Sequence, residues 1–476
     1  MSEISFINSF EMNVLWTDWL VYILLGFITI FVLYARKHEH LRAPWRQILT
    51  RRLAMSACIV LLAFASIGIL DSVHFHKAEG VKVDGSVRYS SEVTSLFEQL
   101  VLPLKSNVEK TYSAPFATQL YAKENVELPD GSVTRDYPRL KFGGAHLDNP
   151  SEQKAADVTQ RSFIAIIQAI LFMMLIILLL AAWLARSQHS DIKTVIGTMW
   201  RGETQLPWKS MLATLFVVIV FVSLVMQLGT VYHIFGTDKV GQDVLYLSLK
   251  SIRTGLVIGT LTTLIMLPFA ILLGIMAGYF RGWVDDLIQY IYTTLSSVPD
   301  ILLIAAGVLL IQVFIENNPD LFPTLQHRAD AKLVFLCLIL GITSWTGLCR
   351  LLRGESLKLR EADYIQAAQA FGVPNLKIIL RHIMPNTMHI VLIVVVLGFS
   401  GLVLAEAVLS YVGVGVDPSM ISWGNMINGA RLEMAREPIV WWSLVAAFIF
   451  MFMLVLAANL FADAVRDAFD PRLRSQ

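Results

Sequence analysis

Residues 361–385 read EADYIQAAQAFGVPNLKIILRHIMP and are followed by the long apolar segment 390–412. The first part of the stretch is charged and rich in good helix formers, and Gly372-Val373-Pro374 predicts a break in the helix. A second, amphipathic helix is expected from Leu376 to Met384, capped by Asn375, with an apolar face of Ile378, Ile379 and Ile383, and ended by Pro385. Lipid does not accommodate so polar a segment. We therefore expect a helix–turn–helix at the membrane surface, where either another protein or the membrane itself covers it.

The composition agrees with a chain that lies mostly in a membrane. Of 476 residues, 55% are hydrophobic and only 16% are charged, with a mean hydropathy of +0.61. Soluble domains carry about 25% charged residues. Apolar runs long enough to cross a bilayer predict an all-α polytopic membrane protein with about nine spans, at 14–34, 53–70, 162–184, 211–229, 254–279, 296–315, 333–349, 390–412 and 440–462.

The distribution of Lys and Arg predicts the orientation of these spans. Basic residues cluster in the connections 35–52, 185–210 and 350–389, which nine spans place on one side. The positive-inside rule makes that side cytoplasmic, with the N-terminus outside and the C-terminus inside. The connection 280–295 is expected on the same side. Residues 71–161 are expected outside, as a small folded domain or a partly ordered loop, with turns at Pro129-Asp130-Gly131, Gly143-Gly144 and Asn149-Pro150.

Several side chains within the spans are candidates for special roles. Glu406 lies deep in the eighth span, where a carboxylate is costly, and is interpreted either as a gate residue or as a buried hydrogen-bonding group. Gly255 and Gly259, and likewise Gly274 and Gly278, stand four residues apart and predict close helix packing.

Other classes of site leave no signal in the sequence. The chain has no phosphate-binding loop of the GxxxxGK[ST] type and no set of metal-ligating or catalytic residues at a recognised spacing. We therefore expect no enzyme active site and no metal site. The formal net charge of +1 gives no indication of nucleic-acid binding.

The spacing of Ala367-Ala368, Gly372 and Pro385 resembles the EAA loop of ABC importer permeases. Gln366, His382 and Met384 depart from that family's pattern, but RHIMPN is similar to the RHILPN variant of the dipeptide and oligopeptide permeases. Further stretches match the same family in order: GTDKVGQDVL at 236–245, GIMAGYFRGWVDD at 274–286, LSSVPDILL at 295–303, AEAVLSYVGVGV at 405–416, SWGNM at 422–426 and NLFADAVRDAFDPR at 459–472.

These matches resemble the second, C-type permease subunit of dipeptide and oligopeptide importers, which implies a type I importer core of about six helices. Residues 236–476 would form the permease core, with a coupling loop at 355–385. The preceding parts are extra helices at 1–70, a periplasmic loop or small domain at 71–161 and further helices at 162–235. The first core helix would be 53–70 or 211–229, and we favour the second because it directly precedes the GTD stretch.

The resemblance also implies a function, partners and sites. The chain would be a permease subunit of a bacterial inner-membrane importer, most simply for di- and oligopeptides. Its partners would be a second homologous permease, two ABC ATPases, a periplasmic binding protein and membrane lipid. No cofactor would bind this chain, since ATP and Mg would be held by the ATPases.

The alternatives are an importer for nickel or another non-peptide solute, and a periplasmic sensing or binding protein built on a permease core.

Three groups of residues are candidate sites. The ATPase-coupling residues would be Glu361, Gln366, Ala367, Ala368, Gly372, Arg381 and Pro385. Candidates for the translocation path or gate are Glu406, Pro299 and Asp300. The external family motif comprises Gly236, Thr237, Asp238 and Asp243.

Overall fold

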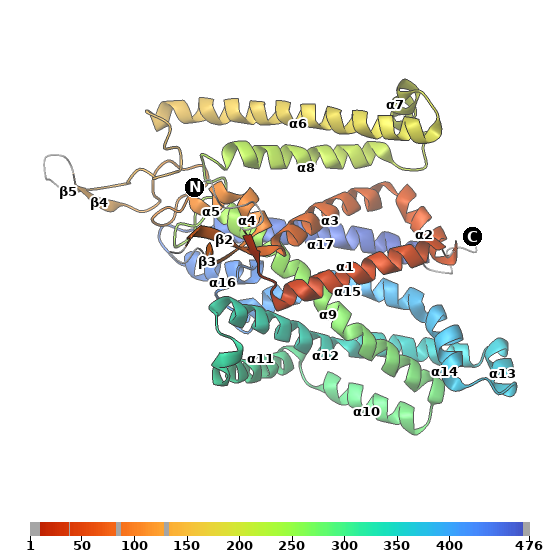
Figure 1. The fold of residues 1–476 in the computed structure, drawn as a ribbon. Helices are drawn as coiled ribbons and strands as arrows, with labels where there is room; N and C mark the ends of the chain where they lie inside the picture. The colour runs from red at the N-terminus through yellow and green to blue at the C-terminus, as the bar shows by residue number, and fades with distance from the viewer. Residues whose placement is uncertain (1–9, 38, 82–86, 128–132, 470–476) are drawn as a thin grey trace. The chain divides into compact units, whose positions relative to one another are not determined.

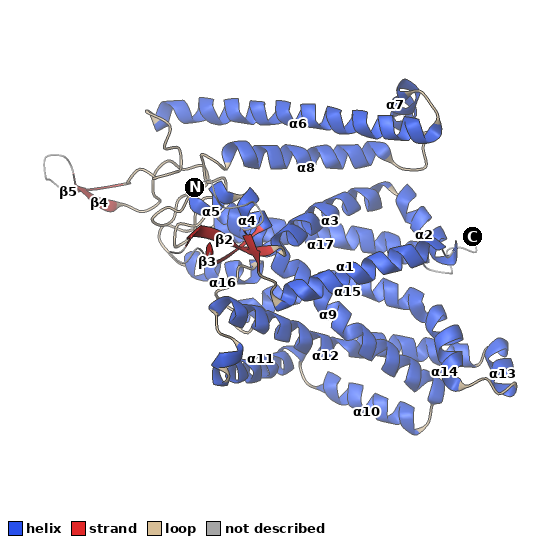
Figure 2. Ribbon diagram, in the orientation of Figure 1, coloured by secondary structure: helices blue, strands red, loops and turns tan. Residues whose placement is uncertain are grey.

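A computed structural model describes residues 10–37, 39–81, 87–127 and 133–469. Within these ranges nine helices are long and apolar enough to cross a membrane, which confirms the predicted number of spans (Figures 1 and 2). They are α1 (Trp16–Lys37), α3 (Arg52–Asp71), α6 (Pro150–Gln188), α8 (Trp208–Leu228), α9 (Val244–Phe280), α11 (Asp300–Asn317), α12 (Leu325–Arg360), the continuous helix 375–412 that includes α15 (Met384–Val412), and α17 (Trp442–Phe469).

Contacts divide the chain into two compact units, and two of the spans run from one into the other. Among the described residues, the first unit contains 10–14, 46–254 and 421–461, and the second contains 15–45, 255–420 and 462–469. The division falls within α9 and within α17, so each of these helices contributes to both units. The two units are described separately below.

In the first unit, α6 and α8 lie side by side as a helical hairpin whose connection carries the short amphipathic helix α7 (Ile192–Arg201) (Figure 1). Helix α3 packs against α8. A further short helix, α2 (Glu39–Thr50), precedes α3, and Pro44 lies inside it. α16 (Trp423–Glu433) precedes α17 and begins with Ser422, whose side chain accepts the Asn425 amide hydrogen in a normal N-terminal cap.

The described part of the region between α3 and α6 contains strands and short helices. β1 (Phe10–Met12), β2 (His74–Val81) and β3 (Val87–Ser95) form an antiparallel sheet in the order β1-β2-β3. Two short helices, α4 (Leu96–Leu100) and α5 (Leu102–Ser106), follow the sheet, and an exposed hairpin is formed by β4 (Glu124–Glu127) and β5 (Val133–Asp136). The predicted turn at 129–131 lies outside the described residues.

The third span is longer than predicted. It begins at Pro150 and not near residue 162, because the segment from Pro150 to Arg161 is polar but contains no helix breaker after Pro150. A proline is well tolerated in the first turn of a helix, where its missing amide hydrogen has no intrahelical partner. The predicted turn at Asn149-Pro150 is thus the point where the helix starts, and the external region ends there.

In the second unit, the glycines of α9 allow α12 to approach closely, as their spacing predicted. A Cβ atom on Gly274 would lie 2.9 Å from the backbone oxygen of Cys349, and one on Gly278 would lie 2.6 Å from that of Arg353. Nearer the start of α9, a Cβ atom on Gly259 would lie 2.5 Å from the Phe399 ring, which belongs to α15. Small residues therefore set the packing of α9 against two neighbouring helices.

The predicted connection 280–295 contains a helix, α10 (Trp283–Ser297). α11 begins at Asp300, after a break at Val298-Pro299, and not at the predicted residue 296. The two helices pack along one partner in antiparallel order: Asp285 pairs with Arg353, Tyr292 clusters with Trp345 and Cys349, and Gly307 meets Ile339. α10 and α11 therefore form one broken span alongside α12.

Candidate functional site

The loop 361–385 has the predicted break between two helical segments. α12 ends at Arg360, α13 covers Asp363–Ala370, and Gly372 adopts φ +73°, a left-handed conformation that favours glycine. α14 (Asn375–Ile378) then runs through a π-helical segment, η3 (Ile379–Ile383), into α15. The loop is thus a short helix–turn–helix that continues directly into a membrane span.

Two details of the prediction were wrong. Asn375 does not cap the second helix; it is the first residue of α14, and the extended residue before it is Pro374. Pro385 does not end a helix, because it lies in the first turn of α15. Proline has no amide hydrogen to donate, and the π-helical register of η3 just before it lets the helix continue past this gap.

An apolar base fixes the loop to the end of α9. Ile365, Ile378 and Ile383 are fully buried and cluster with Ile275 and Tyr279 of α9. The predicted apolar face of the second helix is confirmed at Ile378 and Ile383, while Ile379 is only partly buried. The loop and the end of α9 therefore share one packed apolar cluster.

The outer surface of the loop is apolar as well as polar. Phe371 is 87% exposed, Leu376 68% and Tyr364 47%. Large side chains exposed together on a short projecting segment are typical of a surface that binds another protein. Of the predicted coupling residues, Ala368 is half-buried against the apolar base, and the others are exposed: Glu361, Gln366, Ala367, Gly372, Arg381 and Pro385.

Polar contacts tie the turn between α9 and α10 to this loop. Arg281 forms an ion pair with Glu361. The Tyr279 hydroxyl donates a hydrogen bond to Asn375 Oδ1 at 2.8 Å and accepts one from Gln369 Nε2 at 3.3 Å. Gln366, which replaces the family's glutamate, donates a hydrogen bond to the backbone oxygen of Glu361 at 3.1 Å.

A second pair joins α10 to α12. The guanidinium of Arg353 binds Asp285 in a bidentate arrangement, with N–O distances of 2.6 and 2.7 Å. Sequence reasoning did not pair Arg281 and Asp285 with any partner. The sequence does place residues of opposite charge, Glu361 and Arg353, in the basic segment 350–389. Only the antiparallel packing of α10 on α12, however, determines which charges meet.

The three predicted path residues do not come together in one place. Glu406 is buried and accepts a hydrogen bond from Ser410 one turn along α15, at 2.8 Å. Both interpretations of Glu406, as a gate residue and as a buried hydrogen-bonding group, stay predictions. Pro299 precedes α11 at the break in the span, and Asp300, in the first turn of α11, is exposed.

The external motif forms a closed turn that starts α9. Gly236 and Gly241 have φ +70° and +80°. The Asp238 carboxylate accepts the amide hydrogens of Val240 and Gln242 at 3.0 and 2.8 Å. Asp243 accepts that of Leu245 at 2.8 Å and so satisfies a free amide at the start of the helix. The predicted motif residues thus shape one loop.

This loop is contacted by Glu109 and Ser113, at the start of the segment 109–143, which sequence reasoning did not anticipate. Thr237 accepts the Ser113 amide hydrogen at 2.7 Å, and the Glu109 amide donates to the Gly241 oxygen at 2.9 Å. The indole of Trp442 adds a hydrogen bond to the Thr237 oxygen at 2.9 Å. The segment is therefore integrated with the motif through backbone contacts, which a sequence pattern does not reveal.

A buried charged cluster holds the same segment. His233 lies 2.8 Å from Asp243 and 3.4 Å from Glu109, and all three side chains are buried. Burial alone would raise the pKa of Glu109, but His233 and the backbone amides of residues 141–143 lower it to about 2. Burial alone would lower the pKa of His233, but the two carboxylates raise it to about 9. His233 is therefore protonated at neutral pH.

Comparison with known proteins identifies the family. The binding-protein-dependent transport system inner membrane component family matches residues 270–475. The oligopeptide transport system permease protein OppC of Haemophilus influenzae is 32% identical over 244 residues, which cover 51% of this chain and 71% of the relative. The dipeptide permease DppC of Alkalihalophilus pseudofirmus is 33% identical over 243 residues, or 51% and 73%.

A third relative is the glutathione transport system permease protein GsiD of Pectobacterium atrosepticum. It is 31% identical over 243 residues, which cover 51% of this chain and 74% of the relative. The shared part thus amounts to about half of this chain and most of each relative. The chain belongs to the binding-protein-dependent transport system inner membrane components, as an ABC permease of the dipeptide/oligopeptide family.

Proposed function

We propose that this permease subunit imports di- and oligopeptides, with its N-terminus outside and its C-terminus in the cytoplasm. The basic connections 35–52, 185–210 and 350–389 support this orientation, because alternation through nine spans puts all three on one side. The loop 361–385 then lies in the cytoplasm, and the sheet β1-β2-β3 and the external motif lie in the periplasm. The names of the relatives support a peptide substrate.

In this proposal the chain works with a second homologous permease, two ABC ATPases and a periplasmic binding protein. ATP and Mg are held by the ATPases, and this chain binds neither. The observation that carries the proposal is the exposed apolar tip of the loop, formed by Tyr364, Phe371 and Leu376, on a base that is packed into the end of α9. The tip offers a surface for one ATPase.

The coupling mechanism follows from these attachments. Closure of the ATPases on ATP would move the loop. The buried base would pass this motion to α9, and the ion pair Arg281–Glu361 would pass it to the turn before α10. The bidentate Asp285–Arg353 pair keeps α10 and α12 moving together. Rocking of these spans would open the path alternately to the two sides of the membrane.

The substitution Gly372→Asp tests the proposal in the assembled transporter. Aspartate at φ +73° is strained and adds a charge at the centre of the proposed ATPase contact. We expect loss of peptide uptake with unchanged amounts of the chain in the membrane. A matched control is Gly202→Asp, at φ +79° in the connection after α7, which should leave uptake intact. Wild-type uptake by Gly372→Asp would refute the proposed coupling.

A further inference from the structure

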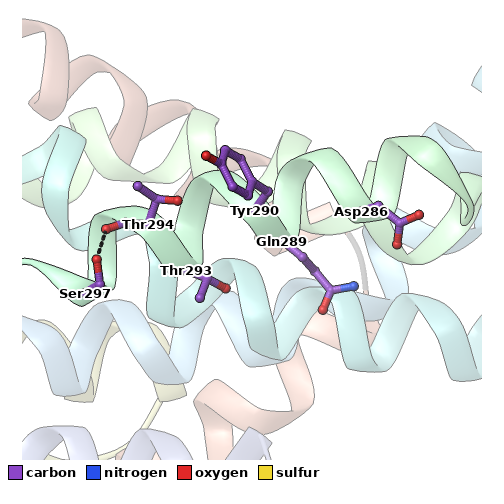
Figure 3. A pocket seen from close by; sticks show the side chains of 6 residues that line it. All are labelled: Asp286, Gln289, Tyr290, Thr293, Thr294 and Ser297. Atoms are coloured by element: carbon purple, nitrogen blue, oxygen red, sulfur yellow. Dashed lines mark hydrogen bonds between the residues drawn. The ribbon is translucent and has the colours of Figure 1, made fainter.

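One face of α10 carries six polar side chains over its whole length. Residues 286, 290, 293 and 297 follow each other at helical spacing of three or four residues, so they share a face. Figure 3 shows this face, along which the helix presents Asp286, Gln289, Tyr290, Thr293, Thr294 and Ser297. All of them are exposed in the single chain except Gln289, which is partly buried. We call this surface the polar stripe.

The opposite face of α10 fixes the depth of the stripe. Ile288 and Tyr292 are buried against Trp345, Leu348 and Cys349, in the part of α12 that the sequence predicts as a span. From Asp286 to Ser297 the helix rises about 16 Å, at roughly 1.5 Å per residue. The stripe therefore starts near the basic end of α12, at the level of Arg353, and descends into the membrane.

Lipid does not suit such a face. Polar side chains at this depth face protein or water rather than hydrocarbon. The contrast with the second half of the same broken span is direct, because the exposed side chains of α11 include Leu302, Leu309 and Leu310, which suit lipid or an apolar partner. α10 also exposes Leu287 and Ile291 beside the stripe, so the break at Val298-Pro299 separates an amphipathic helix with one polar face from a mainly apolar helix.

We infer that the polar stripe lines the cytoplasmic half of a water-filled path and hydrogen-bonds the main chain of a peptide in transit. This inference rests on the proposed function. The stripe is neutral apart from Asp286, and hydroxyl and amide groups can both donate and accept hydrogen bonds. Ser297 already donates its hydroxyl hydrogen to the Thr294 backbone oxygen at 2.7 Å, so in this conformation it can only accept a hydrogen bond from a peptide. Such groups recognise the peptide units that all peptides share, whatever their side chains. Asp286, at the cytoplasmic end, complements the ammonium group at the N-terminus of a peptide.

Thiol labelling tests whether water reaches the stripe. Thr293→Cys and Ser297→Cys are introduced separately and treated, in the assembled transporter in membranes, with a charged, water-soluble thiol reagent. The matched control is Thr29→Cys, since Thr29 is also an exposed hydroxyl residue in a span, on α1, and its hydroxyl bonds to the Leu25 oxygen of its own helix as that of Ser297 bonds to the Thr294 oxygen. The wild-type chain is the blank, because Cys337 and Cys349 are buried and Cys58 is partly buried.

We expect both stripe cysteines to react and Thr29→Cys to remain unmodified. A casein hydrolysate, as a source of mixed short peptides, should slow the reaction of the stripe cysteines when the binding protein and ATP are present. Failure of both positions to react would overturn the inference and indicate a dry contact with the second permease. Reaction without protection by the hydrolysate would overturn the assignment to peptide.

Removal of a single hydroxyl gives an independent test. Thr293→Val keeps the shape of the side chain and removes its hydrogen-bonding group, and loss of one such bond to a peptide raises KM for uptake about fivefold. Thr29→Val should leave KM unchanged. Equal KM values for Thr293→Val and the wild type would contradict the inference. If the wild-type transporter takes up no peptide at all, the proposed function fails instead, so the two failures are distinguishable.

Discussion

Substitution of Gly241 by alanine should release the segment 109–143 from the external motif. Gly241 has φ +80°, and a Cβ atom there would lie 1.8 Å from the backbone oxygen of Glu109 and 2.4 Å from its carbonyl carbon. No side-chain movement relieves contacts with backbone atoms, so the segment itself must move. Its movement would also break the hydrogen bond from the Glu109 amide to the Gly241 oxygen.

The size of the effect follows from two contributions. The left-handed conformation costs an alanine roughly 1–2 kcal/mol, and a steric clash in a packed site costs about 1–3 kcal/mol. The local free energy of opening should therefore fall by about 2–5 kcal/mol, where 1.4 kcal/mol is a factor of ten in an equilibrium constant. Amide hydrogens of the segment should then exchange roughly 30 to 4,000 times faster.

Hydrogen exchange measured by mass spectrometry on peptides from 109–121 provides the assay. Gly202→Ala is the matched control, because Gly202 has φ +79° but no atom within 4 Å of the added Cβ. It carries the same conformational penalty in a distant connection and should leave exchange in 109–121 unchanged. Equal exchange in the wild type and Gly241→Ala would refute the reasoning that this segment is packed against the motif.

Two further predictions concern the charged groups. In a double-mutant cycle of Asp285→Asn and Arg353→Gln, we expect each single substitution to lower the free energy of unfolding by roughly 1–3 kcal/mol, because it leaves the partner's half-buried charge unpaired. We expect the double substitution to cost less than the sum of the two single ones. Additive effects in denaturation of the purified protein would contradict the pairing. The His233 cluster should make the docking of 109–143 pH-dependent. The raised pKa of His233 contributes stability below pH 6.5 that is lost as the pH rises to about 9, whereas the lowered pKa of Glu109 contributes stability above pH 4.5 that is lost as the pH falls to about 2. Hydrogen exchange of residues 109–121, corrected for its intrinsic pH dependence, should show an acid and an alkaline transition in the wild type. His233→Gln should show only the acid transition. An unchanged alkaline transition in this variant would exclude His233 as its source.

Much of the membrane part was predictable because its determinants are local. Each span is a continuous apolar run, and the break at Gly372-Val373-Pro374 lies in residues whose own conformational preferences end a helix. The packing role of Gly274 and Gly278 followed from their spacing alone. The number of spans and the position of the loop were therefore confirmed by the structure.

The parts that were missed depend on contacts between distant residues. α10 is amphipathic and too short to register as a span, so its residues were interpreted as a connection; only its packing on α12 identifies it as half of a broken span. The contact of Glu109 with His233 joins residues more than a hundred positions apart. Pro385 continues a helix because of the π-helical register before it, which residue preferences do not predict.

The central claim is that the loop 361–385 contacts an ATPase in the cytoplasm. Replacing the exposed Phe371 by benzoylphenylalanine keeps an aromatic ring at the tip and allows photo-crosslinking in the assembled transporter. A second site, the exposed Tyr137 just after β5, serves as the control on the proposed periplasmic side. We predict a crosslink from position 371 to an ATPase subunit and none from position 137. A probe at 371 that captures no ATPase, or one at 137 that does, would contradict the account.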